Sequence, residues 1–537
     1  MKKKKYLTEL CCGSFASAVY CLGRTIYETT DFRGIQSSPL QYFLLFLAGS
    51  ILAAGLFRLL HALVRKAGNC QRPEGGEKFF SHKRTYLLLW LLLIAVYVIC
   101  YVSYYPGTFA YDAPPQTYQA FGRDPLNTHH PVLHTVLWGI CLRLGARLAG
   151  GGTAGLVIYS IGEILVVTAV SVLVVYEIYR VTARAGAAVL ASLYYLLVPM
   201  LSVMSFSLTK DVLFGCFLVL FILMLYEAAV QEKKGNLSGL FAAGLLSSLF
   251  RNNMIYVVIL VFVMAFILRY SHKIKAVLFG IILTYCLIMK LVFPLVGVVE
   301  GEKCEAFPAV MVQLAGIYVN SPELLDQEEK ETILAYMPDA DSFNRHFADY
   351  VKSTFDNERY EEDSRTFWNT YFSLLRKAPV QCLCLFLDLN VDYWYPGAEI
   401  PDRYSMRAYI ETDTQEKEIY PVENAGYLPK IHAFYEKVAA HELTIMNLPV
   451  LGYFFSLAFP FGSLLVCIYL TICDKRRENV LVLGVLAGLF LTFILGPVSN
   501  FRYLYPFYLA MPLYFCFAAA GADRVREQKV SFRGLLW

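Results

Sequence analysis

The chain is short of charged side chains. Asp, Glu, Lys and Arg make up 17% of its 537 residues, whereas a soluble protein of this size carries about 25%. Hydrophobic residues make up 57%, and they come in long runs rather than in the stripes of amphipathic helices. This scarcity of charge excludes a set of ordinary water-soluble domains and predicts that much of the surface faces lipid.

Several other features are missing. The 14 cysteines include no CxxC pair and no zinc-like spacing, so they indicate neither redox nor zinc chemistry. The chain shows no internal repeat and no low-complexity segment, and nothing in it indicates a nucleic-acid partner. The apolar stretch that follows Lys2–Lys5 lacks a small-residue cleavage site, so we expect an uncleaved first helix.

What is present are apolar runs of about 20 residues, the length that spans a bilayer. They predict an all-α polytopic membrane protein with about 12 transmembrane helices. The expected spans are 7–26, 40–64, 86–105, 155–179, 185–204, 209–230, 237–251, 253–270, 276–298, 448–471, 479–498 and 503–521. Lys and Arg cluster in short connecting loops, which should face the cytoplasm. We therefore expect a multi-pass protein of a cell membrane, with both termini cytoplasmic.

Residues 131–149 decide whether this topology is consistent. They look helical, but counting them as a span would place every later basic cluster outside, and they carry Arg143 and Arg147. We expect them to lie at the outer surface as an interfacial helix. The chain then divides into N-terminal transmembrane helices (1–104), a first outer loop (105–154), a transmembrane core (155–298), an outer soluble domain (299–447), and C-terminal transmembrane helices with a cytoplasmic tail (448–537).

The segment 299–447 is far too long for a connector. It holds 27 of the 43 acidic residues but only 13 of the 47 basic ones. Aromatic-rich helical stretches, and a short apolar helix opened by Pro379, predict a mostly helical outer domain. Its Trp394-Tyr395-Pro396 stretch suits an acceptor sugar, because aromatic faces stack on sugar rings; surface packing is the plainer alternative for these side chains.

Polar residues gather in the first outer loop, which carries Tyr111, Asp112, Gln116, His129 and His130. Asp112 lies just beyond a span and is backed by aromatic residues, so partial burial should raise its pKa. Such a carboxylate can accept a proton from an attacking hydroxyl near neutral pH. The alternative is that Asp112 only caps a helix opened by the prolines that follow it, with the histidines satisfied at the interface.

Further polar residues stand at three other outer ends of spans: Lys210 and Asp211; Arg251 and Asn252; Arg502, Tyr503 and Tyr505. An arginine there suits a phosphate or diphosphate, which it binds with paired donors without losing its charge. Snorkelling to the interface is the alternative for each one alone. Four polar sites on one face favour a phosphate-binding site.

A metal site has weaker support. His130 and His134 are one helical turn apart and could bind a metal with Asp112, but Pro131 and the absence of a second carboxylate weigh against it. We predict no metal ligands and no definite cofactor, and leave divalent-metal dependence open. Glu163 and Lys290 are the other ionisable residues in apolar runs, and we assign them no role.

The pattern resembles the glycosyltransferase-C superfamily, whose members use polyprenyl-phosphate sugars. Tyr111-Asp112 stands where protein O-mannosyltransferases and lipid A aminoarabinose transferases have their acidic motif, and His130-Pro131 stands at their His-Pro position. Tyr105-Pro106-Gly107, with Asp112, Gln116 and His129-His130-Pro131, also resembles an uncharacterised bacterial membrane-protein family. Arg502-Tyr503-Leu504-Tyr505-Pro506 is similar to the arginine-bearing start of a late helix in such enzymes. The mannosyltransferases have a second acidic residue after the Asp, where this chain has Ala113.

The resemblance implies a membrane glycosyltransferase with a glycosyltransferase-C-like fold. A polyprenyl-phosphate sugar would be the donor, and a cell-envelope glycan, lipid or protein would be the acceptor, at an active site facing outside. Asp112 would be the base, with His130 as a second catalytic residue, and Lys210, Arg251 and Arg502 would bind the donor phosphate. The expected substrate-binding residues are Tyr111, Gln116, His129, Asp211, Asn252, Tyr503 and Tyr505. A transporter or a flippase for lipid-linked sugars is the alternative, although the chain shows no matching halves.

Overall fold

The computed structural model describes residues 2–69, 79–109, 112–149, 153–230, 235–399, 422 and 425–520. Within these residues the protein is helical, with no β-strand beyond three isolated bridges. The predicted all-α class is therefore confirmed. Helices are the expected outcome of such apolar runs, because lipid offers backbone groups no hydrogen-bond partners outside their own segment.

Seven helices in the described part of the chain are long and apolar enough to cross a membrane: Pro39–Lys66, Lys83–Ser103, Val132–Ala149, Thr153–Thr182, Lys210–Val230, His272–Leu295 and Arg477–Ile494. Six apolar helices are shorter: Ala185–Leu197, Leu237–Phe250, Met254–Ile267, Pro308–Asn320, Pro379–Leu389 and Phe459–Asp474. These helices support a helical membrane protein, whereas the number of 12 spans stays a prediction.

Two of the expected spans are broken. The run 185–204 divides into α9 (Ala185–Leu197) and α10 (Pro199–Met204), because Val198 is extended and Pro199 opens the second helix. The run 448–471 likewise divides into α24 (Leu451–Phe455) and α25 (Phe459–Asp474).

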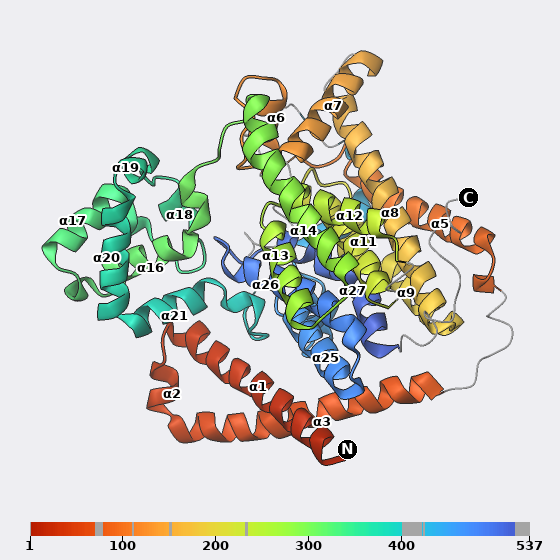
Figure 1. Cartoon of the computed structure of the whole chain (residues 1–537), viewed down its shortest axis with the longest axis horizontal. Coiled ribbons are helices and arrows are strands. Elements are labelled where there is room, and N and C mark those ends of the chain that lie inside the picture. The colour runs from red at the N-terminus through yellow and green to blue at the C-terminus, as the bar shows by residue number, and fades with distance from the viewer. Residues whose placement is uncertain are drawn as a thin grey trace.

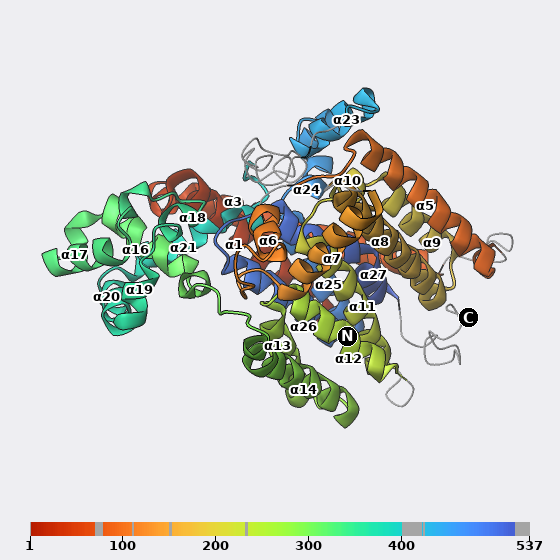
Figure 2. The ribbon, with the colours of Figure 1, turned by 90° about the horizontal axis from the view of Figure 1, so that it is seen from above.

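The centre of the molecule is built from α8 (Thr153–Thr182), α11 (Lys210–Val230) and α27 (Phe501–Ala519). Helix α11 is buried along almost its whole length. It approaches α27 closely at Gly215, where an added Cβ would lie 3.4 Å from the Cα of Pro506. Further helices surround these three (Figures 1 and 2): α5 (Lys83–Ser103), α12 (Leu237–Phe250), α13 (Met254–Ile267), α14 (His272–Leu287) and α26 (Val480–Ile494).

A long hairpin of α1 (Lys2–Thr29) and α3 (Pro39–Asn69) runs along one edge of the molecule (Figure 1). Its two helices touch backbone to backbone, since a Cβ added at Gly13 would lie 2.6 Å from the carbonyl oxygen of Ser50. The hairpin meets the rest of the protein at α25, where Asp474 Oδ1 lies 3.0 Å from His61 Nε2.

The first outer loop contains α6 (Ala113–Ala120) and α7 (Val132–Ala149). Helix α7 packs antiparallel to the start of α8, so closely that a Cβ at Gly145 would lie 2.2 Å from the backbone nitrogen of Gly155. Because α7 also satisfies the length and composition of a span, its position at the membrane surface stays a prediction.

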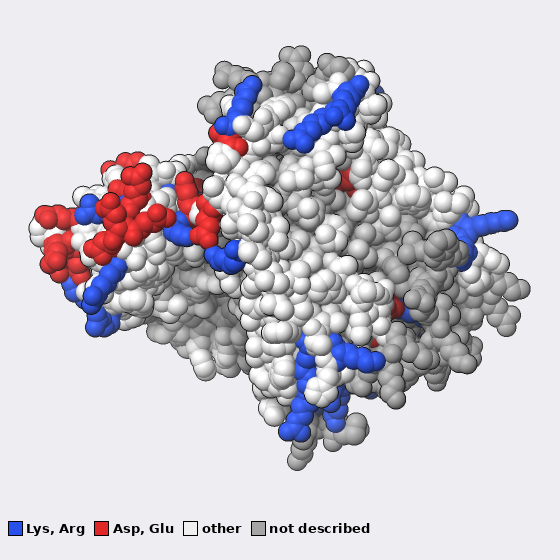
Figure 3. Space-filling model, turned by 45° about the horizontal axis from the view of Figure 1, so that its top comes forward, with Lys and Arg blue, Asp and Glu red and all other residues white. Residues whose placement is uncertain are grey.

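Residues 299–399 begin as a lobe with its own hydrophobic core, which draws on residues 304–385. Its helices are α16 (Pro308–Asn320), α17 (Gln327–Tyr336), α18 (Asp349–Lys352), α19 (Asn357–Glu362), α20 (Ser364–Lys377) and α21 (Pro379–Leu389). Acidic side chains gather on this lobe, beside a broad face without charge (Figure 3). From Cys384 to Tyr395, and again at α23 (Pro429–Ala439), the segment instead joins the core of the membrane helices.

Candidate functional site

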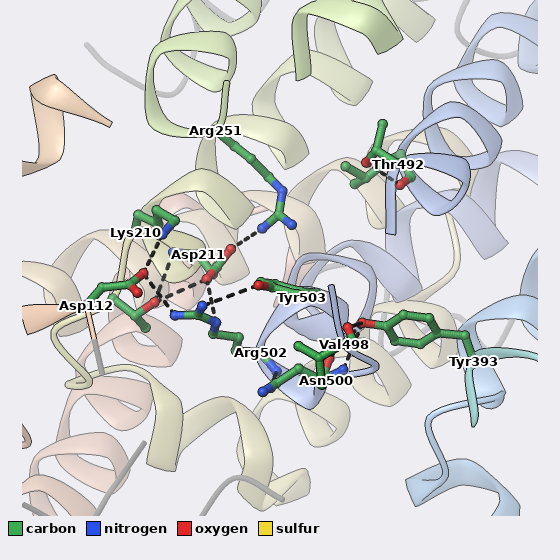
Figure 4. A network of polar contacts seen from close by, with 12 residues as sticks. Asp112, Lys210, Asp211, Arg251, Tyr393, Thr492, Val498, Asn500, Arg502 and Tyr503 are labelled. Carbon is green, nitrogen blue, oxygen red and sulfur yellow. Dashed lines mark hydrogen bonds and ion pairs between the residues drawn. The ribbon is translucent and has the colours of Figure 1, made fainter. Parts of the chain in front are cut away.

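Five charged side chains, from four separate parts of the chain, meet in one buried network (Figure 4). Lys210 Nζ donates to Asp112 Oδ2, and Arg502 Nη1 lies 2.9 Å from the same oxygen. Arg251 pairs with Asp211 Oδ1, and Arg502 Nε lies 3.6 Å from Asp211 Oδ2. Arg502 therefore joins the two carboxylates into a single network.

Helix ends bring these residues together. Asp112 directly precedes α6, Lys210 is the first residue of α11, and Arg251 directly follows α12. Arg502 is the second residue of α27, whose first turn is fixed by the Asn500 side chain, which accepts from the backbone N–H of Arg502 at 3.0 Å. Rigid helices thus hold every charge of the network, which suits a site that must be set before a ligand arrives.

Asp112 is not a helix cap. It occupies the N-cap position of α6, but its side chain makes no capping hydrogen bond and turns to Lys210 and Arg502 instead. Burial by itself raises the pKa of Asp112, but the neighbouring Arg502 and Lys210 outweigh it and hold that pKa well below its ordinary value. The expectation of a raised pKa was wrong, because desolvation could be read from the local sequence while the two cations could not.

His130 faces this network. Its side chain is buried, its Nδ1 has no hydrogen-bond partner among the described residues, and it interacts electrostatically with Asp112. Burial lowers the pKa of His130 to about 3, so the imidazole is neutral. His129 lies beside it and is exposed, with 4.4 Å between the two ring centroids and 3.5 Å from its Nδ1 to Glu305 Oε1.

Aromatic rings enclose the two arginines. The guanidinium carbon of Arg251 lies 4.6 Å from the ring centroid of Tyr503 and 4.8 Å from that of Phe493. The Tyr503 ring also stacks on Arg502 at 5.0 Å, and its hydroxyl accepts from Arg502 Nη2 at 3.3 Å. Such faces restrain a guanidinium without neutralising it, so Tyr503 lies within the network, while its predicted contact with substrate stays a prediction.

Asn252 supports the site from behind. Its Nδ2 donates to the carbonyl of Thr128 at 2.9 Å, and the Thr128 hydroxyl accepts from the backbone N–H of Gly301 at 2.9 Å. The backbone N–H of Val299 also donates to the carbonyl of Leu126 at 2.9 Å. These contacts fix the loop that carries His129 and His130, and the predicted substrate contact of Asn252 stays a prediction.

Other predicted site residues lie elsewhere. Gln116 is buried and directed at His134, with 2.6 Å between its Oε1 and His134 Nδ1. Tyr505 is fully buried in the bundle, and its hydroxyl has no partner among the described residues. Tyr111 lies outside the described residues. Lys290 is not buried: its side chain is 76% exposed and binds Glu300 at 2.6 Å.

The Trp394-Tyr395-Pro396 stretch serves packing instead of presenting aromatic faces. Trp394 and Tyr395 are both buried. The Trp394 indole donates to Asn390 Oδ1 at 2.7 Å, and the Tyr395 ring lies 5.5 Å from that of Tyr20 on α1. At these two positions, therefore, no exposed aromatic ring is available to stack on an acceptor sugar.

Sequence reasoning missed Tyr393, which holds the turn before Arg502. The Tyr393 hydroxyl accepts from the backbone N–H of Asn500 at 2.8 Å (Figure 4). The lobe formed by residues 304–385 also contacts this turn: the backbone N–H of Ala348 donates to the carbonyl of Pro497 at 2.9 Å. An Asn before a helix is a recognisable N-cap pattern, but no local signal marks Tyr393, 107 residues away from Asn500 in the chain.

Two sets of residues carry atoms of the kinds that bind metals. Both ring nitrogens of His134 are engaged, Nδ1 with Gln116 and Nε2 with Tyr159 at 2.8 Å, so His134 does not complete a site with Asp112 and His130. Outside the network, ligand atoms of Glu302, Cys304 and Glu305 lie within 4.8 Å of one another. There Lys352 Nζ, 3.0 Å from Glu305, already supplies positive charge.

A family model matches residues 121–531, and it is described as a family of unknown function, DUF6020. Lys210, Asp211, Arg251 and Arg502 lie inside the matched region, while Asp112 precedes it. No curated protein and no solved structure matches the chain.

Proposed function

We propose that this chain, which belongs to the DUF6020 family because the family model matches most of its length, is an integral membrane glycosyltransferase. It moves a sugar from a polyprenyl-phosphate donor to an acceptor on the outer face of the membrane. The observation that carries the proposal is the convergence of Lys210, Arg251 and Arg502 on two carboxylates, Asp112 and Asp211, that Arg502 joins (Figure 4).

The charge of the network suits a phosphate. Among the described residues of the network, three cations face two carboxylates and His130 is neutral, so the cations exceed the carboxylates by one. A buried excess of positive charge is unfavourable by itself and is relieved when an anion enters. Arg251 and Arg502 provide planar donor sets that match phosphate oxygens, and Lys210 adds a point charge.

The proposed reaction is an inverting transfer. An acceptor hydroxyl attacks the anomeric carbon of the sugar, the bond from that carbon to the donor phosphate oxygen breaks, and the hydroxyl proton passes to Asp112. The polyprenyl phosphate leaves with the bonding electrons, and Lys210, Arg251 and Arg502 stabilise the negative charge that develops on it. The aromatic rings around Arg251 exclude water from this region, which strengthens that stabilisation.

The low pKa of Asp112 makes it a weak base while Lys210 and Arg502 bind it. Donor binding changes this, because the phosphate competes for the same two cations and draws them from the carboxylate. Asp112 then regains basicity in the complex in which a proton must be accepted. His130, neutral and buried beside it, provides a polar contact for the incoming acceptor.

The test is an assay of the purified full-length protein in lipid nanodiscs with a panel of polyprenyl-phosphate sugars and acceptor extracts from the cell envelope. Transfer that is lost in Asp112→Asn and retained in Glu300→Gln, a surface carboxylate also bound by two lysines, supports the proposal. Binding of polyprenyl phosphates that is unchanged in Arg251→Ala and Arg502→Ala would overturn it.

A further inference from the structure

A chain of four buried polar side chains leads from the site into the membrane core. Gln116 Oε1 on α6 lies 2.6 Å from His134 Nδ1 on α7, and His134 Nε2 lies 2.8 Å from the hydroxyl of Tyr159 on α8. The same hydroxyl lies 3.1 Å from Oε1 of Glu163, one turn further along α8. None of these four side chains takes part in the proposed reaction. They affect it only through the position of α6.

No cation in the described part of the chain pairs with Glu163. Among the described residues it makes no ion pair, and its Oε2 has no hydrogen-bond partner. Besides Tyr159, the titratable groups that face it are Cys141 on α7, Cys216 on α11 and Tyr505 on α27. None of these is cationic, so an ionised carboxylate would be isolated in a buried, lipid-surrounded bundle at a large free-energy cost.

Counting hydrogens along the chain leads to the same conclusion. If Glu163 carries its proton, its O–H can donate to Tyr159, the Tyr159 O–H to His134 Nε2, and the His134 Nδ1–H to Gln116 Oε1. All four groups are then neutral and each contact has one donor. An ionised Glu163 would need either a doubly protonated His134, which separates charge in a buried site, or a reversed Gln116 amide.

The chain ends on the helix that carries Asp112. The backbone N–H of Gln116 donates to the carbonyl of Asp112 at 3.3 Å, in the first turn of α6. A second side-chain hydrogen bond joins α7 to α6, from the Trp138 indole to the Thr117 hydroxyl at 2.9 Å. The orientation of His134 therefore helps to set the position of Gln116 and, through α6, of Asp112.

We propose that Glu163 is a protonated positioning residue, whose acid proton fixes the tautomer of His134 and thereby the α6 turn that presents Asp112. Its importance for turnover rests on the proposed transferase function, whereas its protonation and its hold on α6 do not. Glu163→Gln, which keeps a neutral donor to Tyr159, should preserve the chain, and Glu163→Ala and Tyr159→Phe should break it.

Two measurements on the purified full-length protein need no activity. The infrared spectrum at neutral pH should show the carbonyl stretch of a protonated carboxylic acid that disappears in Glu163→Gln and shifts with ¹³C-labelled glutamate. Hydrogen exchange of the α6 amides (113–120) should accelerate in Tyr159→Phe and Glu163→Ala but not in Glu163→Gln. A carboxylate band in place of the acid band, or equal exchange in all variants, would overturn the proposal.

Turnover gives a third readout. With the transferase assay, Tyr159→Phe should lower kcat by about 10-fold or more while the donor KM changes little, because misplacing a reacting group costs rate rather than affinity. Glu163→Gln should match the wild type at neutral pH and keep its rate at alkaline pH, where ionisation of Glu163 disables the wild type. Thr117→Val, which removes the neighbouring α6–α7 hydrogen bond, is the matched control and should leave the pH profile unchanged. Absence of transfer in every form, with the acid band present, would refute the transferase and leave Glu163 protonated as proposed.

Discussion

Replacing Asp112 by Asn tests the chemical step while preserving the shape of the site. The amide keeps the size of the carboxylate and can still accept a hydrogen bond from Lys210 or Arg502, but it cannot take a proton from an acceptor hydroxyl. General-base catalysis contributes about 100- to 10,000-fold, so we expect kcat to fall by at least about 100-fold.

The same substitution should not weaken donor binding. Among the described residues, the network holds three cations and two carboxylates, and removing the charge of Asp112 raises the excess of cations over carboxylates from one to two. The donor phosphate then has no carboxylate to displace from Lys210 and Arg502. We expect the dissociation constant of the donor to stay the same or to decrease, measured with a polyprenyl phosphate in nanodiscs.

Arg502→Ala is the opposite perturbation. It removes a charge-assisted contact with the phosphate, worth about 1.5 to 3 kcal/mol, which corresponds to donor binding that is about 10- to 100-fold weaker. Arg502→Lys should restore part of this loss, since a point charge replaces a planar fork. Asp112→Asn should therefore act on kcat, and Arg502→Ala mainly on donor affinity.

Folding must be measured alongside, because Asp112 is a partner of two cations with side chains only 15% and 9% exposed. Breaking a buried ion pair costs about 3 to 5 kcal/mol; we expect less here, since Arg502 retains Asp211 and the amide retains a hydrogen bond. An Asp112→Asn protein that unfolds like the wild type and transfers sugar at the wild-type rate would refute the assignment of the base.

Three further predictions concern the support of the site and the topology. Tyr393→Phe removes the hydrogen bond that the backbone N–H of Asn500 donates to the Tyr393 hydroxyl, so it should destabilise the protein by about 0.5 to 1.5 kcal/mol and weaken donor binding through Arg502; unchanged thermal unfolding would contradict this. Burial raises the pKa of Asp392 to about 7, so the folded state holds this proton more tightly than the unfolded state, and the resulting stability is complete at low pH and lost as pH rises through about 7. Urea unfolding between pH 5 and 8 should show this loss in the wild type and a flatter profile in Asp392→Asn. A cysteine at 83 or 475 should resist a membrane-impermeant reagent from outside, while cysteines in 105–154 and 299–447 react; labelling at 475 would reverse the topology.

The members of the site could be predicted because each lies at the end of an apolar run. Lys210, Arg251 and Arg502 all stand where a helix starts or stops. An ionisable group at the edge of a membrane span is costly, so its presence there indicates a functional role. The positive-inside rule assigned these ends to one side of the membrane, which made convergence a reasonable expectation. The structure brings them together with both carboxylates.

The pairing within the site could not be predicted. Lys210 is 98 residues from Asp112, and Arg502 is 390 residues away, so the two cations that lower the pKa of Asp112 are set by helix packing and not by local sequence. The aromatic residues around Asp112 predict that it is buried, but burial alone would raise the pKa of Asp112 and not lower it. The burial of Tyr505 and the exposure of Lys290 depend in the same way on which face of a helix meets its neighbours.

Arg502 couples the protonation of Asp112 to that of Asp211, because it contacts both carboxylates. It binds Asp112 at 2.9 Å and lies 3.6 Å from Asp211, which also holds Arg251. A phosphate that attracts Arg502 therefore weakens the ion pairs of Arg502 with both Asp112 and Asp211. Asp112 then has fewer positive charges nearby to oppose its protonation. In the proposed reaction, the base gains strength only after the donor has bound, so the pH profile of kcat should show an acid limb at higher pH than the profile of kcat/KM. Coincident acid limbs would mean that the phosphate does not take Arg502 and Lys210 from Asp112, and that the proton goes elsewhere.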